Sequence, residues 1–392
     1  MATQNYRYDP LYRVIDETRE MRLIEGHYKE NFERLKRINS LGMIPEVIEM
    51  AKYSKYEHSI GTVYQINCLL DIVDKIEKKY HIPLRFSAQF LHIGHFPYTY
   101  STERGLLIAC YVGNTDKIKR DRQKIEGLIK KIIEYHEISE PEKEKIIADI
   151  FSLREFSKLY KFFSTDFFLH HATLLNEFVE RDSIDLCKKT IVNNLTNEKS
   201  DGYQFLCLAD KTDFVQRDAL YFGTVKLDIS PKHLYRKASE NITIPSNEES
   251  LIDANYDYLK NTFYDDTNVL LFSRLYEKIV AALLLHEKFE FDWLQQYDDD
   301  TFKWLLINKK TREKNEEVDL PTEWTNKAKL LFERKLKYNL IFELEAIEFE
   351  KKKDVIQIEH ELIGKTQPII NLGDCKISAP TNKRWGRWIF RN

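Results

Sequence analysis

Three histidines are the side chains of this chain best suited to carry chemistry. His58 stands at the start of one apolar segment, and His92 and His95 follow near the end of the next. A neutral imidazole nitrogen ligates transition metals, and imidazole also transfers protons near neutral pH. By spacing alone, however, the three histidines are more typical of polar residues at helix ends than of a metal centre.

A segment rich in carboxylates lies in the middle of the chain, at 208–223, and reads LADKTDFVQRDALYFG. Asp210 and Asp218 are two helical turns apart, so their side chains can share one face of a helix. On its own, the segment also fits a charged helix whose polar face is solvated.

The elements that must position these residues are predicted to be helices. Glycine and proline are scarce, at 12 and 10 of 392 residues, which favours helices over sheets and turns. Apolar residues recur at helical spacing in several segments, and the predicted helices include 32–41, 60–73, 125–133, 269–286 and 323–336. The apolar segment 85–95 is predicted to be buried, and 141–180 to hold further helices.

Other segments are predicted to be extended or irregular. Residues 9–15 read as a short extended entry, and the polar stretch 228–266 as a loop. Alternating apolar residues at 341–349 and 355–358 suggest strands. The sequence therefore predicts a mainly α fold with a helical core over 1–308 and a small α+β C-terminal region over 309–392.

Charge and cysteine content indicate which binding partners and which cellular compartment to expect. A net charge of −3 does not call for nucleic acid or an anionic membrane surface. Five dispersed cysteines without a CxxC pair favour a reducing compartment, and neither a signal sequence nor a membrane span is recognisable, so we expect a cytoplasmic protein. The basic, aromatic end at 383–391 could contact nucleic acid, but an edge strand with packed tryptophans is the favoured interpretation.

Three segments together resemble one known family. They are KYEHSIGTV at 55–63, FLHIGHFPYTY at 90–100 and DKTDFVQRDALYFG at 210–223. They resemble the R-[FY]-E-H-S-L-G-V, L-H-D-I-G-H-G-P-F-S-H and D-x-D-[KR]-x-D-Y-x-x-R-D-x-x-x-x-G patterns of the HD-domain phosphohydrolases, in particular the deoxynucleoside triphosphate triphosphohydrolases. The resemblance extends in pieces over about residues 9–306 and implies an HD-domain helical bundle.

The resemblance implies a divalent metal held by His58, His92 and Asp210. The family's histidine–aspartate doublet is altered here, and two alignments are open. Without a gap, Leu91 takes the place of the histidine and His92 that of the aspartate; with a one-residue gap, His92 is the histidine and the aspartate is missing. A less anionic site of three ligands favours Zn, Fe or Ni over Mn or Mg, although the metal could also be absent.

The resemblance also assigns roles around the metal. It implies that His95 faces the phosphates and that Tyr100 stands where the family has a histidine proton donor. The implied phosphate-binding and sugar-binding residues are Lys55, Lys211, Asp218, Phe214 and Ser40. In this last group Lys55 replaces an arginine, Phe214 a tyrosine and Ser40 a glutamine.

Three functions remain open at this point. The favoured hypothesis is a divergent protein that binds a nucleotide, dNTP or NTP, and hydrolyses it slowly or not at all. The second is an active metal-dependent phosphohydrolase with a remodelled site. The third is a structural protein in which Leu91, Phe96, Tyr100 and Phe214 fill the former site. The resemblance also implies a homo-oligomer.

Overall fold

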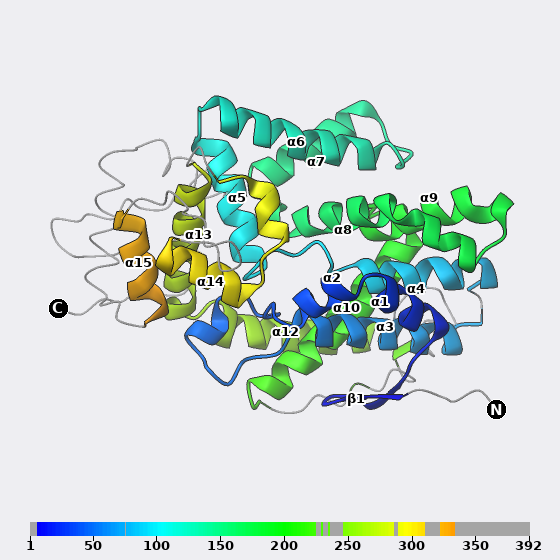
Figure 1. Ribbon diagram of the computed structural model, residues 1–392. Coiled ribbons are helices and arrows are strands. Elements are labelled where there is room, and N and C mark those ends of the chain that lie inside the picture. Colours follow the sequence, from blue (N-terminus) through cyan, green and yellow to red (C-terminus); the bar gives the residue numbers. More distant parts are fainter. Residues whose placement is uncertain are drawn as a thin grey trace.

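The structure is a computed structural model that describes residues 6–74, 76–224, 229, 234–235, 246–285, 289–309 and 322–333, with backbone alone at 246–250. It confirms the predicted mainly α fold (Figure 1). A two-stranded antiparallel sheet, in which Tyr6 faces Asp16 and Asp9 faces Arg13, is the only sheet in the described part of the chain. The extended entry predicted at 9–15 falls on this hairpin.

The described part of the chain contains two strands and a series of α-helices. The strands are β1 (Tyr6–Asp9) and β2 (Arg13–Asp16), and the helices are α1 (Arg19–His27), α2 (Lys29–Leu35), α3 (Lys55–Ile72), α4 (His81–Phe90), α5 (Tyr100–Val112), α6 (Asp116–Ile133), α7 (Glu140–Phe151), α8 (Leu159–His170), α9 (Ile184–Thr196), α10 (Asp201–Tyr221), α12 (Ser246–Leu259), α13 (Thr267–Leu284), α14 (Asp299–Asn308) and α15 (Thr322–Phe332).

Helices α3 and α10 form the central pair, and α4 packs against both of them. Helix α3 begins at Lys55 because Ser54 and Glu57 form a reciprocal capping box at its first turn. His58 is therefore inside the helix. Gly61 allows the two helices to approach closely, since a Cβ at this position would lie 1.8 Å from Oδ1 of Asp213 on α10.

The turn between α4 and α5 carries His92 and His95. Gly94 presses this turn against α8, where a Cβ would lie 2.4 Å from the backbone nitrogen of Ser164. Arg34 Nη2 donates to the carbonyl oxygens of Ile93 and His95, at 2.9 Å each. These contacts fix the turn on two sides, so both imidazoles come from a rigid segment.

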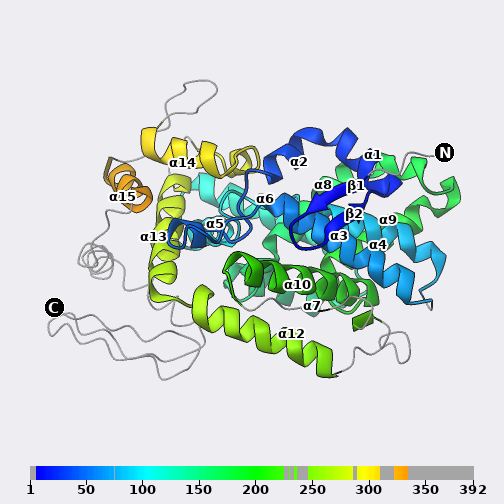
Figure 2. The same ribbon diagram turned by 90° about the horizontal axis from the view of Figure 1, so that it is seen from below.

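The remaining helices surround this centre. Helices α6 and α7 pack against each other beside α8, and α13, α14 and α15 gather at one end of the molecule (Figures 1 and 2). Helix α12 lies along α10. One hydrophobic cluster connects these layers and includes the buried Ala328, Leu331 and Phe332 of α15. None of the described helices has the length and apolar character needed to cross a membrane.

Two local predictions were wrong. The helix predicted at 32–41 ends at Leu35, because the backbone turns away there and the Asn39 amide donates to the carboxylate of Asp299. The loop predicted at 228–266 contains α12 and a π-helical turn at Lys260–Tyr264.

Part of the predicted C-terminal region lies outside the described residues. Helix α15 agrees with the helix predicted at 323–336 and packs against α13 and α14. The strands predicted at 341–349 and 355–358, and the basic, aromatic end at 383–391, fall beyond the described residues. The proposed boundary between residues 308 and 309 stays a prediction.

Replacing Gly94 with alanine is expected to lower stability, because its Cβ would meet the backbone of α8, which cannot move aside without opening the core. Overpacking of this kind costs about 1–3 kcal/mol. Gly127, in α6, is the matched control, since a Cβ added there would have no atom within 4 Å. Gly127→Ala should stabilise the helix by about 0.5–1 kcal/mol. Urea denaturation measures both variants, and equal midpoints would refute this account of the turn.

Candidate functional site

Three side chains that the sequence pointed to converge at one place. The Nε2 atoms of His58 and His92 each lie 2.9 Å from Oδ1 of Asp210. All three potential ligand atoms lie within 4.8 Å of one another, and no other group of His, Cys, Asp or Glu in the described residues meets this condition. The two imidazole rings are tilted at 36° with centroids 4.4 Å apart.

Each of these side chains comes from a different element. His58 is in the first turns of α3, His92 is in the turn after α4, and Asp210 is near the middle of α10. Both histidines are buried, whereas the Asp210 side chain keeps 19% of its exposure. Solvent therefore reaches the cluster at Asp210 and not at the two histidines.

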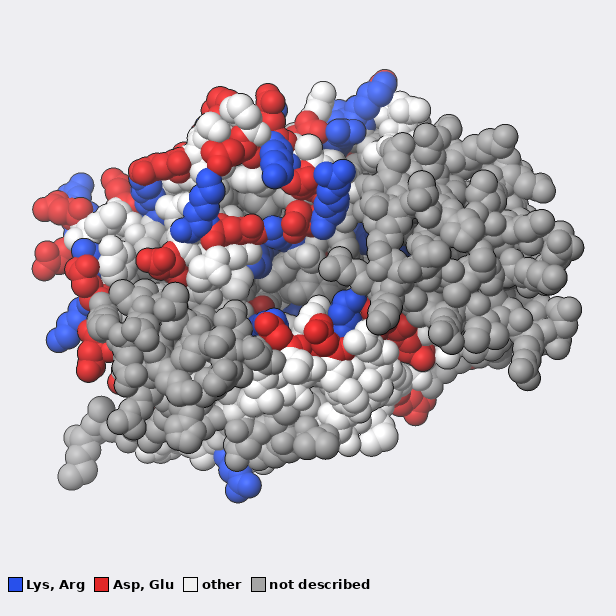
Figure 3. Space-filling model, turned by 180° about the vertical axis from the view of Figure 1, so that it is seen from behind, with Lys and Arg blue, Asp and Glu red and all other residues white. Residues whose placement is uncertain are grey.

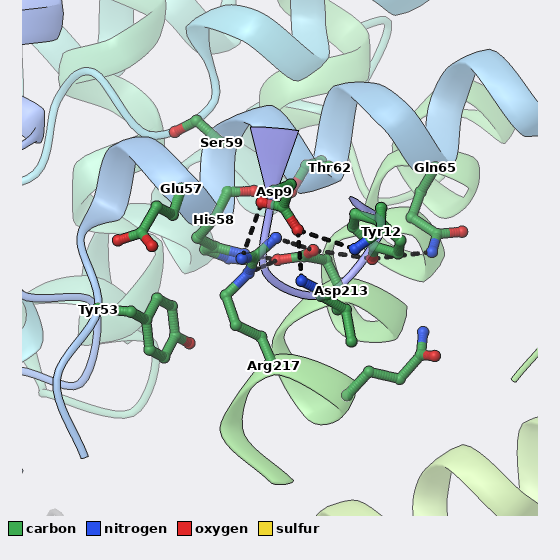
Figure 4. A network of polar contacts seen from close by, with 12 residues as sticks. Asp9, Tyr12, Tyr53, Glu57, His58, Ser59, Thr62, Gln65, Asp213 and Arg217 are labelled. Carbon is green, nitrogen blue, oxygen red and sulfur yellow. Dashed lines mark hydrogen bonds and ion pairs between the residues drawn. The ribbon is translucent and has the colours of Figure 1, made fainter. Parts of the chain in front are cut away.

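A second layer of polar residues supports His58 from below (Figure 4). Nδ1 of His58 lies 2.6 Å from Oδ2 of Asp213. Asp213 is completely buried and also accepts hydrogen bonds from Nε and Nη2 of Arg217, at 3.1 and 2.9 Å. Because Asp213 accepts at Nδ1, the imidazole of His58 is held with its Nε2 atom toward Asp210.

The N-terminal hairpin completes this second layer. The Asp9 carboxylate accepts from Nη1 of Arg217 at 3.1 Å, and the Tyr12 hydroxyl donates to Oδ1 of Asp213 at 2.8 Å (Figure 4). Gln65 of α3 in turn donates to the Tyr12 oxygen at 3.0 Å. Residues more than 200 positions apart in sequence thus fix a single carboxylate.

The pKa values of the two histidines are shifted in opposite directions. Burial would lower the pKa of His58, but the carboxylates of Asp210 and Asp213 outweigh burial and raise it. Burial, together with the neighbouring His58, lowers the pKa of His92 to about 3. Burial would raise the pKa of Asp210, yet the two histidines hold it well below its usual value. His92 is therefore a neutral imidazole at physiological pH, the form that ligates metals.

The donor set fits a divalent metal ion. Two ligands at right angles and about 2.1 Å from a metal lie about 3.0 Å apart, close to the observed separations from Asp210 Oδ1. Two imidazoles with one carboxylate suit Zn²⁺ or Fe²⁺ better than Mg²⁺. His58 has the carboxylate partner that ligating histidines usually have, whereas Nδ1 of His92 is buried without one among the described residues. His92 would be the weaker ligand of the two.

The structure gives the two residues of the altered doublet different roles, under either alignment. His92 faces His58 and Asp210, while Leu91 is 1% exposed and belongs to the hydrophobic core. The carbonyl oxygen of Leu91 accepts from the Ser164 hydroxyl at 2.7 Å, which anchors this residue to α8. The side chain at position 92 therefore takes the place beside His58, and Leu91 has a packing role.

His95 is paired with a residue that the sequence did not indicate. Its Nδ1 atom lies 2.7 Å from Oε1 of Glu103, and both side chains are fully buried. Tyr160 of α8 stacks on the His95 ring at 3.8 Å between centroids, and Tyr100 meets it edge-on at 5.2 Å. Burial lowers the pKa of His95 and raises that of Glu103, so the pair is neutral.

The two predicted phosphate-binding lysines differ in their surroundings. Lys55 is 3% exposed, and its Nζ lies 5.6 Å from the centroid of the Tyr100 ring. Burial lowers the pKa of Lys55, an effect that Asp210 and Glu103 partly offset. Lys211, by contrast, forms a close ion pair with Asp253 on α12. Lys55 therefore lies among the metal-site residues, whereas Lys211 is tied to the neighbouring helix.

The predicted sugar-binding residues lie further along α10. Both carboxylate oxygens of Asp218 accept short hydrogen bonds, one from the Tyr53 hydroxyl and one from the Tyr264 hydroxyl. Burial raises the pKa of Asp218 to about 6. Ser40 is buried beside Tyr53, to whose carbonyl its backbone nitrogen donates at 2.9 Å. Two tyrosines thus already occupy the carboxylate that the resemblance assigns to a sugar.

Aromatic side chains border the site without all entering it. Phe214 is half-buried and meets the His58 ring edge-on, with 6.3 Å between centroids. Tyr100 keeps 37% of its exposure at the rim. Phe96 packs against Phe163 of α8, at 5.0 Å. Of the four residues that could have filled the site, Leu91 and Phe96 pack into the core instead.

The sequence did not indicate the residues that hold the site histidines and Asp213 in place through hydrogen bonds and ion pairs. Asp213 and Arg217 carried a signal, because they are four residues apart on the predicted helix of Asp210. Asp9 and Tyr12 lie in the segment 9–15, where the family resemblance begins, but nothing in the sequence linked them to Asp213 and Arg217. Glu103 carried no signal, because only the fold determines its position.

Comparison with known proteins adds no assignment: no family model matches this chain, and no curated protein matches it at a significant level.

Metal binding is expected to depend on the three converging residues. His58→Ala and Asp210→Ala should weaken binding of Zn²⁺ or Mn²⁺ by more than about 100-fold. Loss of a residue that only hydrogen-bonds to a metal ligand costs about 10–100-fold, and these variants remove a ligand itself. His92→Ala should cost less. Asp218→Asn is the matched control, a buried carboxylate on the same helix whose oxygens are taken by tyrosines. Calorimetric titration and elemental analysis measure these effects; equal loss in Asp218→Asn would contradict the assignment.

The second layer is expected to tune this affinity. Asp213→Asn removes a charged acceptor from His58 and should reduce metal affinity about 10–100-fold. Asp121→Asn is the control, because it breaks a different buried ion pair, with Lys117 at 2.9 Å. Both variants should lose stability, since each leaves a buried cation short of a carboxylate. Only Asp213→Asn should lose metal affinity, and equal affinities would show that Asp213 has a purely structural role.

Proposed function

We propose that this chain is a divergent HD-domain protein that binds the phosphates of a nucleotide, dNTP or NTP, at a divalent metal centre formed by His58, His92 and Asp210. The observation that carries the proposal is the convergence of these side chains from three separate segments. A bound divalent ion would neutralise phosphate charge and polarise a phosphoryl oxygen or a water molecule. The chain's own residues would orient the phosphates around it.

Two buried groups are suited to hold phosphate oxygens. The ammonium of Lys55 makes no ion pair with any described residue, yet it is 3% exposed. A buried cation is stabilised by an anion, and phosphate is one that an ammonium binds readily. In the neutral pair, Glu103 donates to Nδ1 of His95, so Nε2 of His95 carries the proton. This N–H is buried without a partner among the described residues and is free to donate to a phosphate oxygen.

Hydrolysis is the second candidate, and the His95–Glu103 pair favours it. A histidine held by a carboxyl group can pass a proton to a leaving oxygen, and the carboxyl group restores the proton afterwards. The tyrosines on Asp218 argue for altered recognition of the sugar, because a substrate hydroxyl would have to replace one of them. We therefore place phosphate binding first and turnover second.

The described part of the face shown in Figure 3 offers nucleic acid no continuous basic surface. On the face shown in Figure 3, basic and acidic side chains are interspersed around a hollow, and no single-signed field covers the described surface seen there. Nucleic-acid binding generally requires a continuous basic surface. A homo-oligomer stays a prediction.

Nucleotide binding is expected to depend on the metal and on Lys55. Titration of a dNTP and NTP panel with Mn²⁺ or Zn²⁺ should give binding that a chelator abolishes. Lys55→Met should weaken it about tenfold or more, since a charge-assisted hydrogen bond is worth about 1.5–3 kcal/mol. Lys52→Met is the control, an exposed lysine three residues earlier.

The same samples test turnover, through chromatography of released phosphate or triphosphate. If turnover occurs, His95→Gln should slow it about 10²–10⁴-fold while nucleotide binding persists. Absence of binding across the panel with every metal would refute the proposed function, and equal binding by Lys55→Met and wild type would remove Lys55 from the site.

A further inference from the structure

A cavity separate from the metal centre lies among α7, α8 and the start of α10. Its volume is about 310 Å³, and none of His58, His92 and Asp210 lines it. Two lysines of its wall, Lys145 and Lys161, are the basis of the inference. A cavity of this size holds a small organic molecule.

Lys161 is a buried cation without a carboxylate partner. It is 9% exposed, and its Nζ contacts the Tyr203 hydroxyl at 3.1 Å and Sγ of Cys207 at 3.6 Å. Burial raises the pKa of both Tyr203 and Cys207, so neither contact supplies a negative charge. No carboxylate of the described residues forms an ion pair with Lys161; its Nζ lies over the Tyr203 ring, 4.3 Å from the centroid, a contact that supplies no formal negative charge.

The carboxylates around the cavity are already paired. Glu142 pairs with Lys199 at 2.6 Å and Asp149 with Arg154 at 3.5 Å, while Glu155, at 2.9 Å, and Glu198 share Lys158. Lys145, on α7, makes no ion pair with a described residue. Two ammonium groups therefore remain without a carboxylate, one deep in the cavity and one at its exposed rim.

Part of the lining is apolar. Ile146 and Ile150 of α7 and Phe162 of α8 belong to it. A cation would meet two unpaired ammonium groups in this cavity, and a neutral apolar molecule would leave Lys161 desolvated without a counter-charge. A ligand with an anionic end and an apolar part satisfies both the lysines and the apolar residues of the lining.

We propose that this cavity binds a small organic phosphate, with its phosphate group between Lys161 and Lys145 and its apolar part against Ile146, Ile150 and Phe162. The site is independent of the proposed metal centre. Lys161 is the anchor, because a buried ammonium loses least on binding a dianion and gains a charge-assisted hydrogen bond.

Phenyl phosphate is a suitable probe, because it carries a dianion and one flat ring, and phenol is its neutral counterpart. Calorimetric titration uses the full chain with a chelator present, so that the metal centre does not hold the probe. Phenyl phosphate should bind at least about tenfold more tightly than phenol, in line with a charge-assisted hydrogen bond.

Four lysine variants locate the probe. Lys161→Met should weaken binding at least about tenfold. Lys145→Met should also weaken binding of the probe. Because Lys145 is exposed, this variant does not disturb the core, and it tests the site even if Lys161→Met fails to fold. Lys124→Met, on the surface of α6, and Lys55→Met, beside the metal centre, should bind as the wild type does.

Several outcomes would overturn the proposal. They are an affinity for phenyl phosphate no greater than for phenol, unchanged binding in both Lys161→Met and Lys145→Met, and a loss confined to Lys55→Met. The last result would place the probe at the metal centre, and it would leave the proposed function standing while removing this second site.

Discussion

The buried carboxylate of Asp213 is the interaction on which the arrangement of the site depends. It binds Nδ1 of His58, the guanidinium of Arg217 and the hydroxyl of Tyr12, and it is fully inaccessible to solvent. A buried anion is costly unless each of its lone pairs is satisfied, and here three elements satisfy them. The orientation of His58 is therefore a consequence of how α3, α10 and the hairpin pack together.

This dependence links the fold to the chemistry. Gly61 lets α3 approach Asp213, and Gly94 lets the turn of His92 approach α8. A side chain at either position would separate the elements that hold the imidazoles. The N-terminal hairpin contributes little core, yet Asp9 and Tyr12 neutralise and orient the central ion pair. A segment remote in sequence thus helps to set the geometry at Nε2 of His58.

The sequence predicted much of this arrangement but not its supporting parts. His58, His92 and Asp210 could be selected because residue type and motif spacing constrain ligands. The alignment of the altered doublet stays open, because His92 would lie beside His58 under either one. Glu103 was missed because its pairing with His95 arises from the path of the turn. Helix α12 was taken for a loop because its described part buries only a narrow stripe, with Ile252 and Leu259 fully inside.

At Asp218 the role implied by the resemblance and the contacts in the structure differ. The resemblance implies that this carboxylate binds a sugar, but it accepts hydrogen bonds from Tyr53 and Tyr264. A motif preserves residue types, but the structure also shows what those residues already contact. Nε2 of His95 is buried without a hydrogen-bond partner among the described residues, and Lys55 is buried without an ion pair to any of them, whereas Lys211 and Asp218 have their partners. His95 and Lys55 are the groups available to a ligand, and both lie near Tyr100.

The central claim is that His58, His92 and Asp210 hold one divalent ion, and anomalous X-ray scattering tests it most directly. Crystals grown with Zn²⁺ and measured on both sides of the zinc absorption edge should show one anomalous peak, about 2.0–2.2 Å from the two Nε2 atoms and the carboxylate. A map with no peak between these three side chains, from crystals in which they are well ordered, would contradict the account.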